Sequence, residues 1–401
     1  MDDDTPSCMS PSTQAKLQFT IQGLINSFGF FLLLSSSESI ALFFGQKNLV
    51  PMLTFSASFG NVVILFINAI WLVKYSPRLR LLCNATFMFI GYAIITIGCF
   101  INFYFVIFGA LFVGIGSAWG QVIHYGFIRR FPSEYVGPFS SGTGMCGLFS
   151  SMLYMILNDY GVADWVIFAC LMPLAIIYAF NFLELHNLYE NSRSFNYLLS
   201  EMTNSNEWSE DLSQDYKDSE EDKVETKNQT VWQAYWIDPW NHPLIFLLYF
   251  FEYIIITCFF DRLAQLRNSF ESDVYLERNL YTVSQFLYQV GVLTARSTLY
   301  CYKSKATGKI SIVMFILCIV YFGFALWYVD VDRYILLILA LFTGLFGGWG
   351  YLFSYYRVLD DSRVTKENRE ILINYLAVCA DFGSFIATGL ATIISNTILE
   401  V

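Results

Sequence analysis

The stretch FSSGTGMCGLFSSMLY, residues Phe139 to Tyr154, opens an apolar segment that is long enough to lie in a membrane, yet many of its residues are Ser or Gly. On an α-helix, Ser140, Gly144, Gly147 and Ser151 recur at intervals that place them on one face. Helices in lipid gain little from burying apolar surface, so close backbone approach and polar contacts hold them together. The stretch therefore predicts a membrane helix that packs closely against a neighbour.

Two further apolar segments carry small residues at a similar spacing. Gly116, Gly120 and His124 lie four residues apart in one segment, and GLFGGWG occupies Gly344–Gly350 in the other. We expect close helix packing at Ser140, Gly142, Gly144, Gly147, Gly116, Gly120, Gly344, Gly347 and Gly348. An alternative for the first stretch is that its backbone N–H groups and hydroxyls also contact a ligand, since a helix N-terminus favours negative charge.

The composition indicates a membrane protein with several spans. Of the 401 residues, 56% are hydrophobic and 14% are charged, and the mean hydropathy is +0.49. Soluble domains carry about 25% charged residues. The nine cysteines lie mostly in apolar runs, which is not the pattern of a disulfide framework.

The sequence lacks the motifs of several other classes. No paired His or Cys spacing predicts a metal site, and phosphate-binding loops, catalytic triads and nucleic-acid motifs are absent. An intramembrane aspartyl protease needs a pair of membrane aspartates, whereas Asp381 in CADFG stands alone. We therefore expect no enzyme activity, no cofactor, no metal and no nucleic-acid partner.

Apolar segments of spanning length follow one another along most of the chain. A spanning helix needs about 20 mostly apolar residues, and eleven segments meet this need. The predicted spans are 17–36, 50–73, 81–101, 103–123, 139–158, 164–183, 243–261, 280–299, 309–328, 334–356 and 371–396. The sequence therefore predicts an all-α polytopic membrane protein with about 11 transmembrane helices.

An acidic stretch, residues 184–242, separates six predicted spans from five. It holds 13 acidic and 4 basic residues, is rich in Ser and Asn, and is expected to be partly disordered. Its end, VWQAYWIDPWNHP, carries the aromatic residues typical of a membrane interface. The expected organisation is a tail (1–16), a six-helix bundle (17–183), this linker (184–242) and a five-helix bundle (243–401).

The distribution of lysine and arginine predicts the orientation. With the N-terminus in the cytosol, 18 of the 23 basic residues face the cytosol and 5 face the other side, as the positive-inside rule requires. An odd number of spans then places the C-terminus in the lumen. The sequons at Asn84 and Asn228 both fall on the cytosolic side, so we expect neither to be glycosylated.

Ionisable residues within spans are costly and mark candidate functional positions. Glu252 has no other charge within eight residues and is a candidate proton carrier. Asp381 lies on a polar stripe with Ser384 and Thr388, which is typical of an inward face. The alternative for each carboxyl is a structural hydrogen bond between helices.

Arg296, Gln285 and Gln289 share one face of their helix, because the separation from 285 to 296 is about three turns. The planar guanidinium suits a phosphate group. The alternative is that Arg296, near the cytosolic end, extends to lipid headgroups.

Four further polar residues lie in or at the end of spans. His124 and Gln121 end the fourth span and Asn26 interrupts the first; all three are candidates for solute binding or proton coupling, and His124 titrates near neutral pH when solvated. Glu38 ends the first span at the luminal boundary and is expected to be exposed.

Several motifs together resemble the battenin family of endolysosomal membrane proteins. FSSGTGMCGLFSSMLY is similar to the family's SSGTG segment, and YQVGVLTARSTL (288–299) to its YQxGVxxSRSSL segment. The other similar stretches are YFFEYIIIT (249–257), GLFGGWGY (344–351) with ENREI (367–371), KYSPRLR (74–80) and GLINS (23–27). The sequence departs from the family at Gln121 and Thr343, where the family has acids.

This resemblance implies a two-bundle fold like that of the major facilitator superfamily, arranged 6+5, in a lysosomal or vacuolar membrane. It also implies export of glycerophosphodiesters and a role in lysosomal pH homeostasis. We therefore expect an alternating-access transporter, with the lipid bilayer, a small polar solute and protons as partners. One alternative is a proton-coupled transporter of basic amino acids. Another is a non-transporting scaffold whose acidic linker binds cytosolic partners.

Overall fold

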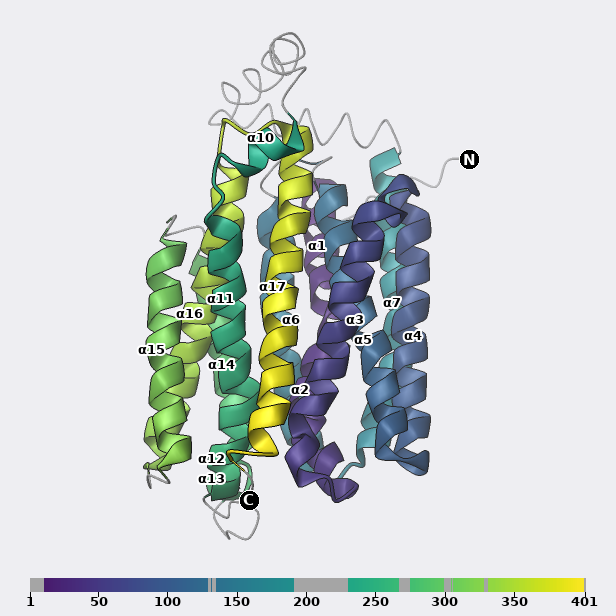
Figure 1. Cartoon of the computed structure of the whole chain (residues 1–401). Coiled ribbons are helices and arrows are strands. Elements are labelled where there is room, and N and C mark those ends of the chain that lie inside the picture. The colour runs from purple at the N-terminus through teal and green to yellow at the C-terminus, as the bar shows by residue number, and fades with distance from the viewer. Residues whose placement is uncertain are drawn as a thin grey trace.

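The structure, a computed structural model, describes residues 11–128, 131, 135–190, 230–266, 275–298, 304, 306–327 and 331–399. All regular elements in these residues are helical, and the long helices run side by side between two ends of the molecule (Figure 1). The predicted tail over residues 1–10 and most of the predicted linker, residues 191–229 with Asn228, lie outside the described residues.

The first half forms the N-terminal bundle. Its elements are α1 (Pro11–Asn26), α2 (Phe28–Phe43), η1 (Lys47–Leu49), α3 (Val50–Ile70), η2 (Leu72–Lys74), α4 (Pro77–Ile101), α5 (Phe103–Ile128), α6 (Val136–Asp159) and α7 (Asp164–Glu190). α1 and α2 are two parts of one span, interrupted at Ser27. The predicted span 17–36 lies within this longer, interrupted segment, and the break follows Asn26, the polar residue that interrupts the predicted span.

The second half forms the C-terminal bundle. Its elements are α10 (Val231–Tyr235), α11 (Asn241–Ile254), the π-helical turn η4 (Ile255–Phe259), α12 (Phe260–Leu266), α13 (Tyr275–Arg278), α14 (Leu280–Ser297), α15 (Thr307–Leu326), α16 (Arg333–Leu359) and α17 (Lys366–Ser395). α11, η4 and α12 make one continuous span. Each of the eleven predicted spans thus corresponds to a long helical segment, in the predicted 6+5 order.

Nine of the helical segments in the described residues are long and apolar enough to cross a membrane. The two remaining predicted spans, α6 and α14, have 24 and 18 residues but carry many small or polar side chains. α6 and α14 pack against each other where the two bundles meet. α3 and α17 form a second contact between the bundles. Polar residues are tolerated there because protein, rather than lipid, surrounds them.

Two glycine pairs bring helix backbones together. Gly23 on α1 lies against the backbone of α6, and Gly142 on α6 lies against the backbone of α1. Gly291 and Gly344 do the same between α14 and α16. A Cβ at any of these positions would meet a main-chain atom, so the small side chain is what permits the approach.

Two of the other predicted packing positions on α6 face α14. Gly144 faces Leu293 and Gly147 faces Gln289, both on α14. Ser140 is buried near the start of the helix. The small face of α6 therefore lies against the C-terminal bundle.

Each of the remaining predicted packing glycines has a side-chain atom as its nearest neighbour. Gly116 faces Met88 on α4, and Gly120 faces polar side chains that include Asn26. Neither glycine has α6 among its nearest neighbours. On α16, Gly347 faces Glu252 and Gly348 faces Ala295.

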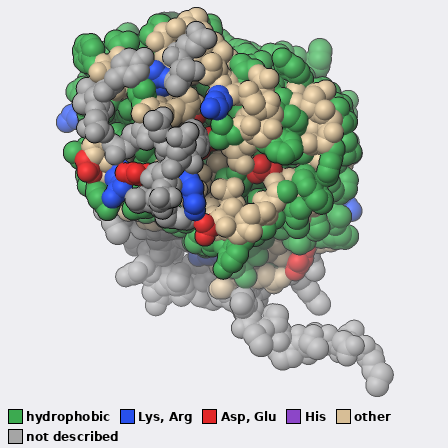
Figure 2. Space-filling model, turned by 90° about the horizontal axis from the view of Figure 1, so that it is seen from below, with side chains coloured by type: hydrophobic (Ala, Val, Ile, Leu, Met, Phe, Trp, Pro, Cys, Tyr) green, Lys and Arg blue, Asp and Glu red, His purple; other side chains and the backbone are tan. Residues whose placement is uncertain are grey.

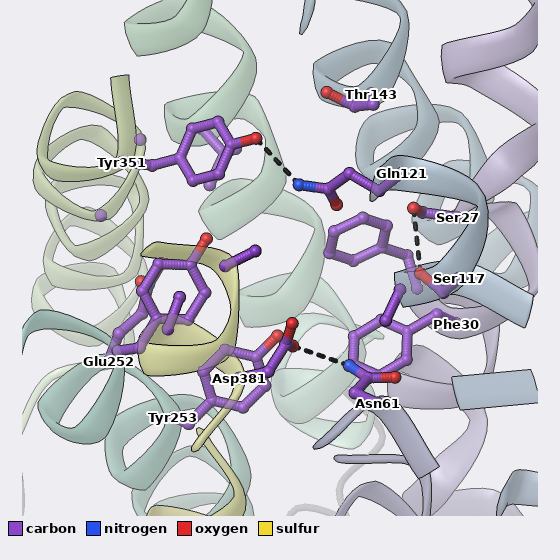
Figure 3. Close-up of a pocket in the computed structure, with 18 of the residues that line it drawn as sticks. Ser27, Phe30, Asn61, Ser117, Gln121, Thr143, Glu252, Tyr253, Tyr351 and Asp381 are labelled. Carbon is purple, nitrogen blue, oxygen red and sulfur yellow. Dashed lines mark hydrogen bonds between the residues drawn. The ribbon is translucent and has the colours of Figure 1, made fainter. Parts of the chain in front are cut away.

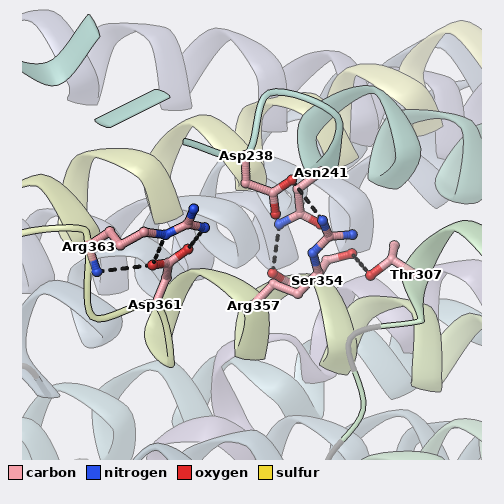
Figure 4. A network of polar contacts seen from close by, with 7 residues as sticks. All are labelled: Asp238, Asn241, Thr307, Ser354, Arg357, Asp361 and Arg363. Carbon is pink, nitrogen blue, oxygen red and sulfur yellow. Dashed lines mark hydrogen bonds and ion pairs between the residues drawn. The ribbon is translucent and has the colours of Figure 1, made fainter. Parts of the chain in front are cut away.

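The described end of the linker is fastened to the C-terminal bundle (Figure 4). Arg357 on α16 pairs with Asp238 at 2.7 Å, and Asn241 donates a hydrogen bond to the Ser354 carbonyl at 2.9 Å. The adjoining aromatic residues Trp232, Trp236 and Trp240 are 67%, 57% and 73% exposed. Their position at one end of the bundles agrees with the predicted interfacial segment.

The two ends of the molecule differ in what they carry. α1 begins at the end that carries α10, whereas α17 ends at the opposite end, beside α12 and α13 (Figure 1). Asn84 lies within α4 and is fully buried, so its side chain is not accessible to a glycan in this structure. Glu38, expected to be exposed, is only 7% exposed, because α2 extends beyond it to Phe43 and the C-terminal bundle covers it.

Candidate functional site

A polar cavity lies at the centre of the molecule, between the two bundles (Figure 3). Its empty volume is about 760 Å³. Its polar and aromatic lining residues are Ser27, Phe30, Phe31, Asn61, Ser117, Gln121, Thr143, Tyr249, Glu252, Tyr253, Tyr288, Arg296, Tyr351, Tyr355 and Asp381. Both bundles contribute, so a relative movement of the bundles changes this cavity directly.

Glu252 enters the cavity from α11, just before the π-helical turn η4. Its side chain is 4% exposed and accepts a hydrogen bond from the Tyr288 hydroxyl at 2.5 Å. The carboxyl lies against Gly347, where a larger residue would displace it. π-helical turns often occur at functional sites, because they shift side chains relative to the preceding helix.

Asp381 enters from α17 and is held by the other bundle. Asn61 on α3 donates a hydrogen bond to its Oδ1 at 2.8 Å (Figure 3). A charged acceptor makes such a bond stronger than one between neutral groups. The pair therefore links the bundles at the cavity wall.

Arg296 brings a positive charge to the same cavity. Its Nη1 donates to the Thr143 hydroxyl on α6 at 3.1 Å, and its guanidinium lies 4.4 Å from the centre of the Tyr351 ring. Its Nε is buried without a hydrogen-bond partner. Because guanidinium groups bind phosphate and carboxylate with two donors, this unsatisfied donor is suited to an anionic group in the cavity.

Tyrosines form much of the remaining wall. The Tyr351 hydroxyl accepts a hydrogen bond from Gln121 at 3.0 Å and shares another with Tyr125 at 2.8 Å. Tyr249 and Tyr355 also lie in ring contact with this group. Aromatic faces bind cations and polar edges bind hydroxyls, so the wall is suited to a polar organic solute.

The structure brings together four of the eight candidate residues. Glu252, Arg296, Asp381 and Gln121 all line the cavity. Within this set, Gln121, Arg296 and Asp381 each contact the opposite bundle.

The two glutamines expected beside Arg296 lie elsewhere on α14. Gln285 is fully buried and donates to the Ile256 carbonyl in η4 at 2.7 Å. Gln289 lies against Gly147 on α6. They share a helical face with Arg296, but the cavity touches that face only at its Arg296 end.

His124 and Asn26 belong to a separate buried polar network in the N-terminal bundle. His124 contacts the Gly120 carbonyl at 2.7 Å and the Gln22 side chain at 3.1 Å. Asn26 accepts a hydrogen bond from the Tyr178 hydroxyl at 2.8 Å and donates to the Ser117 carbonyl at 2.9 Å. This network ties α1, α5 and α7 together beside the break at Ser27.

Sequence reasoning missed several residues of the cavity. Asn61 is a polar side chain within a span, so the rule that selected Asp381 applied to it as well. Tyr249 with Tyr253, and Tyr351 with Tyr355, are spaced four residues apart on their helices, and this repeat was the available signal. Thr143 had no signal beyond its place in the small-residue stretch.

The comparison with known families decides the family. A family model described as CLN3 protein matches residues 17–401. The chain belongs to the CLN3 protein family. Among curated relatives, battenin of Dictyostelium discoideum is 28% identical over 400 residues, covering 96% of this chain and 94% of that protein. Protein BTN1 of Debaryomyces hansenii is 24% identical, covering 92% and 90%. The resemblance to battenins is confirmed.

Solved structures confirm the fold of this CLN3 family member. A D-xylose-proton symporter has a TM-score of 0.60 at 12% identity, covering 97% of this chain and 98% of that one. The major facilitator superfamily symporter XylE, bound to 6-bromo-6-deoxy-D-glucose, has a TM-score of 0.64 at 11% identity, covering 94% and 87%. The predicted major-facilitator-like fold is therefore correct. Family and fold together indicate a multi-pass membrane transporter.

Proposed function

We propose that this protein is an alternating-access carrier that exports a small phosphate-bearing solute, such as a glycerophosphodiester, across a lysosomal or vacuolar membrane. Transport of this kind contributes to pH homeostasis in the organelle when protons move with the solute. The proposed orientation places the N-terminus and linker in the cytosol and the C-terminus in the lumen. The observation that carries the proposal is the placement of Arg296, Glu252 and Asp381 around one cavity between two bundles.

Arg296 is the proposed anion-binding group. It hydrogen-bonds the neutral Thr143 and stacks near Tyr351, and its Nε is unsatisfied. A phosphodiester carries one negative charge and two free oxygens, which match the fork of a guanidinium. The tyrosines and Gln121 supply hydrogen bonds to the hydroxyl groups of the solute.

Glu252 and Asp381 are the proposed proton-binding groups. Each is held by one neutral donor, Tyr288 and Asn61 respectively. A neutral donor permits either protonation state, whereas a salt bridge to a cation would hold the carboxylate ionised. Arg296 lines the same cavity, but in the described residues no salt bridge joins it to either carboxyl. Proton uptake at these carboxyls would change the net charge of the cavity as the solute enters or leaves.

The contacts around the cavity support alternating access. Gln121 with Tyr351, Thr143 with Arg296, and Asn61 with Asp381 each join one bundle to the other. Rocking of the bundles breaks contacts on one side of the cavity while those on the other side persist. The carrier therefore changes conformation by exchanging a small number of polar contacts.

A proton-coupled carrier of basic amino acids is the second candidate. The two carboxyls in the cavity favour it, because they would compensate the charge of a lysine or arginine side chain. Arg296 opposes it, because a second cation in the same cavity is repelled. The two candidates therefore predict opposite effects for removal of the Arg296 charge.

Uptake into proteoliposomes tests the proposal. We expect the purified protein to accumulate radiolabelled glycerophosphocholine, and Arg296→Gln to reduce this uptake by about tenfold or more, as loss of a charged hydrogen bond implies. Arg296→Lys should recover only part of it, since Lys lacks the fork. Arg333→Gln, which removes a cation at the other end of the C-terminal bundle, is the matched control and should transport normally.

Two outcomes contradict the phosphodiester proposal. One is uptake that is indifferent to Arg296→Gln. The other is accumulation of radiolabelled lysine that increases in Arg296→Gln, which would establish the amino acid carrier instead.

A further inference from the structure

A second hollow opens at the end of the molecule opposite α10, which Figure 2 views directly. Apolar side chains make up much of the rim of this face, and charged and polar ones lie both toward its middle and at its edges. The hollow, called here the end vestibule, has an empty volume of about 900 Å³. It is lined by Glu38, Ser39, Leu42, Tyr154, Asn158, Asp159, Arg278, Asn279 and Thr282.

Glu38 stands at the inner side of the end vestibule. It belongs to α2 of the N-terminal bundle and is 7% exposed. Its Oε1 is buried without a hydrogen-bond partner. A buried carboxylate oxygen with no donor is strongly destabilising, so this atom requires a proton or a cation.

Asp261 is a second buried carboxyl close to Glu38, contributed by the other bundle. It lies on α12, is 2% exposed, and is close enough to Glu38 for direct electrostatic interaction. Both of its oxygens accept from Gln265 at 2.9 Å. The pair therefore spans the junction of the bundles.

Tyr281 marks the same junction. It lies within electrostatic range of both carboxyls, and its hydroxyl donates to the Leu34 carbonyl at 2.9 Å. Since Tyr281 belongs to α14 and Leu34 to α2, this bond closes the bundles beside the carboxyl pair. Opening this end requires the bond to break and separates Glu38 from Asp261.

The other charged groups around the pair do not neutralise it fully. Arg262 adjoins Asp261 and is buried, and it offsets one negative charge. Arg278 is exposed at the far side of the end vestibule, where water screens it. Asp164, which accepts from Ser39 at 3.0 Å, adds further negative charge on α7. Tyr154 is neutral. Among the residues that the structure describes, two carboxyls beside one guanidinium leave at least one negative charge uncompensated.

We propose that Glu38 and Asp261 form a second proton-binding site, shared between the bundles, that holds this end of the carrier closed while it is protonated. Two buried carboxylates within electrostatic range of each other are repulsive, as in other carboxyl pairs that share one proton. A single proton on either carboxyl removes the excess charge and the repulsion. Opening hydrates both groups and releases the proton.

The site differs from the central cavity in position and in role. Glu38 and Asp261 do not line the cavity that holds Glu252 and Asp381. The proposal therefore concerns a gate and does not depend on which solute is carried. In the proposed orientation this end faces the lumen, so an acidic lumen would favour closure.

Distance measurements between spin labels test the gate. Phe43, at the end of α2, and Trp327, at the end of α15, are 72% and 75% exposed and lie on different bundles at this end. Both would be replaced by labelled cysteines in full-length protein without its native cysteines, held in nanodiscs. We expect a short distance between the labels at pH 5 and a growing population with a long distance toward pH 8. The ratio of the long-distance to the short-distance population should change by up to about tenfold per pH unit if one proton is released.

Matched variants assign this effect to the pair. Glu38→Gln and Asp261→Asn should each keep the short distance at pH 8, because the amide removes the repulsion. Asp159→Asn, at an exposed carboxyl in the same vestibule, and Glu38→Asp should keep the pH dependence. Gel filtration and circular dichroism confirm that each variant is folded.

The outcomes separate this proposal from the transport proposal. A wild-type distance that ignores pH, or a pH dependence that survives both Glu38→Gln and Asp261→Asn, overturns the gate. The gate stands if the pair controls the distance while glycerophosphocholine uptake is absent, and in that case only the proposed substrate fails.

Discussion

Asn61 on α3 donates a hydrogen bond of 2.8 Å to Asp381 on α17, and this bond joins the two bundles at the wall of the central cavity. The pair places a carboxyl where both the solute and the bundle movement affect it. A change at either residue should therefore alter stability and transport together.

Replacing Asn61 by Leu tests this link. The change removes the donor and leaves Asp381 facing an apolar group, which should lower the free energy of unfolding by about 1–3 kcal/mol. The thermal midpoint of the purified protein in detergent reports the loss. Asn158→Ala, at the half-buried end of α6, serves as the control and should have little effect; an equal loss in both variants would count against the pair.

Glu252→Gln tests the proposed proton carrier. The glutamine keeps the shape of the side chain and an acceptor for Tyr288 but carries no proton. Solute uptake by proteoliposomes should become less dependent on pH, so the ratio of the rates at pH 5 and pH 7 moves toward one, because one titrating group is removed while Asp381 and the Glu38–Asp261 pair remain. Glu184→Gln, exposed on α7, should retain the wild-type profile. An unchanged profile in Glu252→Gln removes this residue from proton coupling.

Gly344→Ala tests the close contact between α14 and α16. The added Cβ would meet the main chain at Tyr288, so the helices must separate and the Tyr288–Glu252 bond shifts with them. We expect a loss of roughly 1–3 kcal/mol in unfolding free energy, as for other overpacked sites. Gly308→Ala is the matched control, because its nearest neighbour is a leucine side chain at 3.6 Å. Equal thermal midpoints for the two variants would be inconsistent with this contact.

Exchanging the acidic linker distinguishes carrier from scaffold. Residues 195–225 would be replaced by a Gly/Ser segment of equal length, which keeps the reach of the chain and removes its charge. Solute uptake should remain within about twofold of wild type, since the central cavity lies in the bundles. Complete loss of uptake by correctly folded protein would instead show that the function depends on the linker.

The orientation is open to a direct experiment. Because α1 begins and α17 ends at opposite ends of the bundles, tags on the two termini should lie on opposite sides of the membrane. In intact lysosomes or vacuoles, protease should remove an N-terminal tag and spare a C-terminal one. The reverse result would refute the proposed placement of the linker in the cytosol.

The spans were predictable because each is a local property of the sequence. Lipid requires about 20 apolar residues and satisfied backbone groups, and this requirement located all eleven segments. It did not reveal the break at Ser27, because Asn26 and Ser27 are stabilised by partners on α5 and α7. It also failed at Glu38, whose burial depends on the C-terminal bundle.

The candidate site was predictable only in part. The cost of charge in lipid selected Glu252, Arg296 and Asp381, and all three line the central cavity. The same reasoning grouped Gln285 and Gln289 with Arg296, since helical periodicity gives a shared face but not the extent of the cavity along it.

The sequence by itself determined that the chain folds into membrane helices and which few charged side chains they retain, because lipid acts on each segment separately. Only the tertiary structure decided which of those side chains meet. Asn61 and Asp381 are 320 residues apart, and Glu38 and Asp261 come from different bundles. Such pairs form because two separately stable bundles dock, and docking depends on the shapes of whole surfaces rather than on any local pattern.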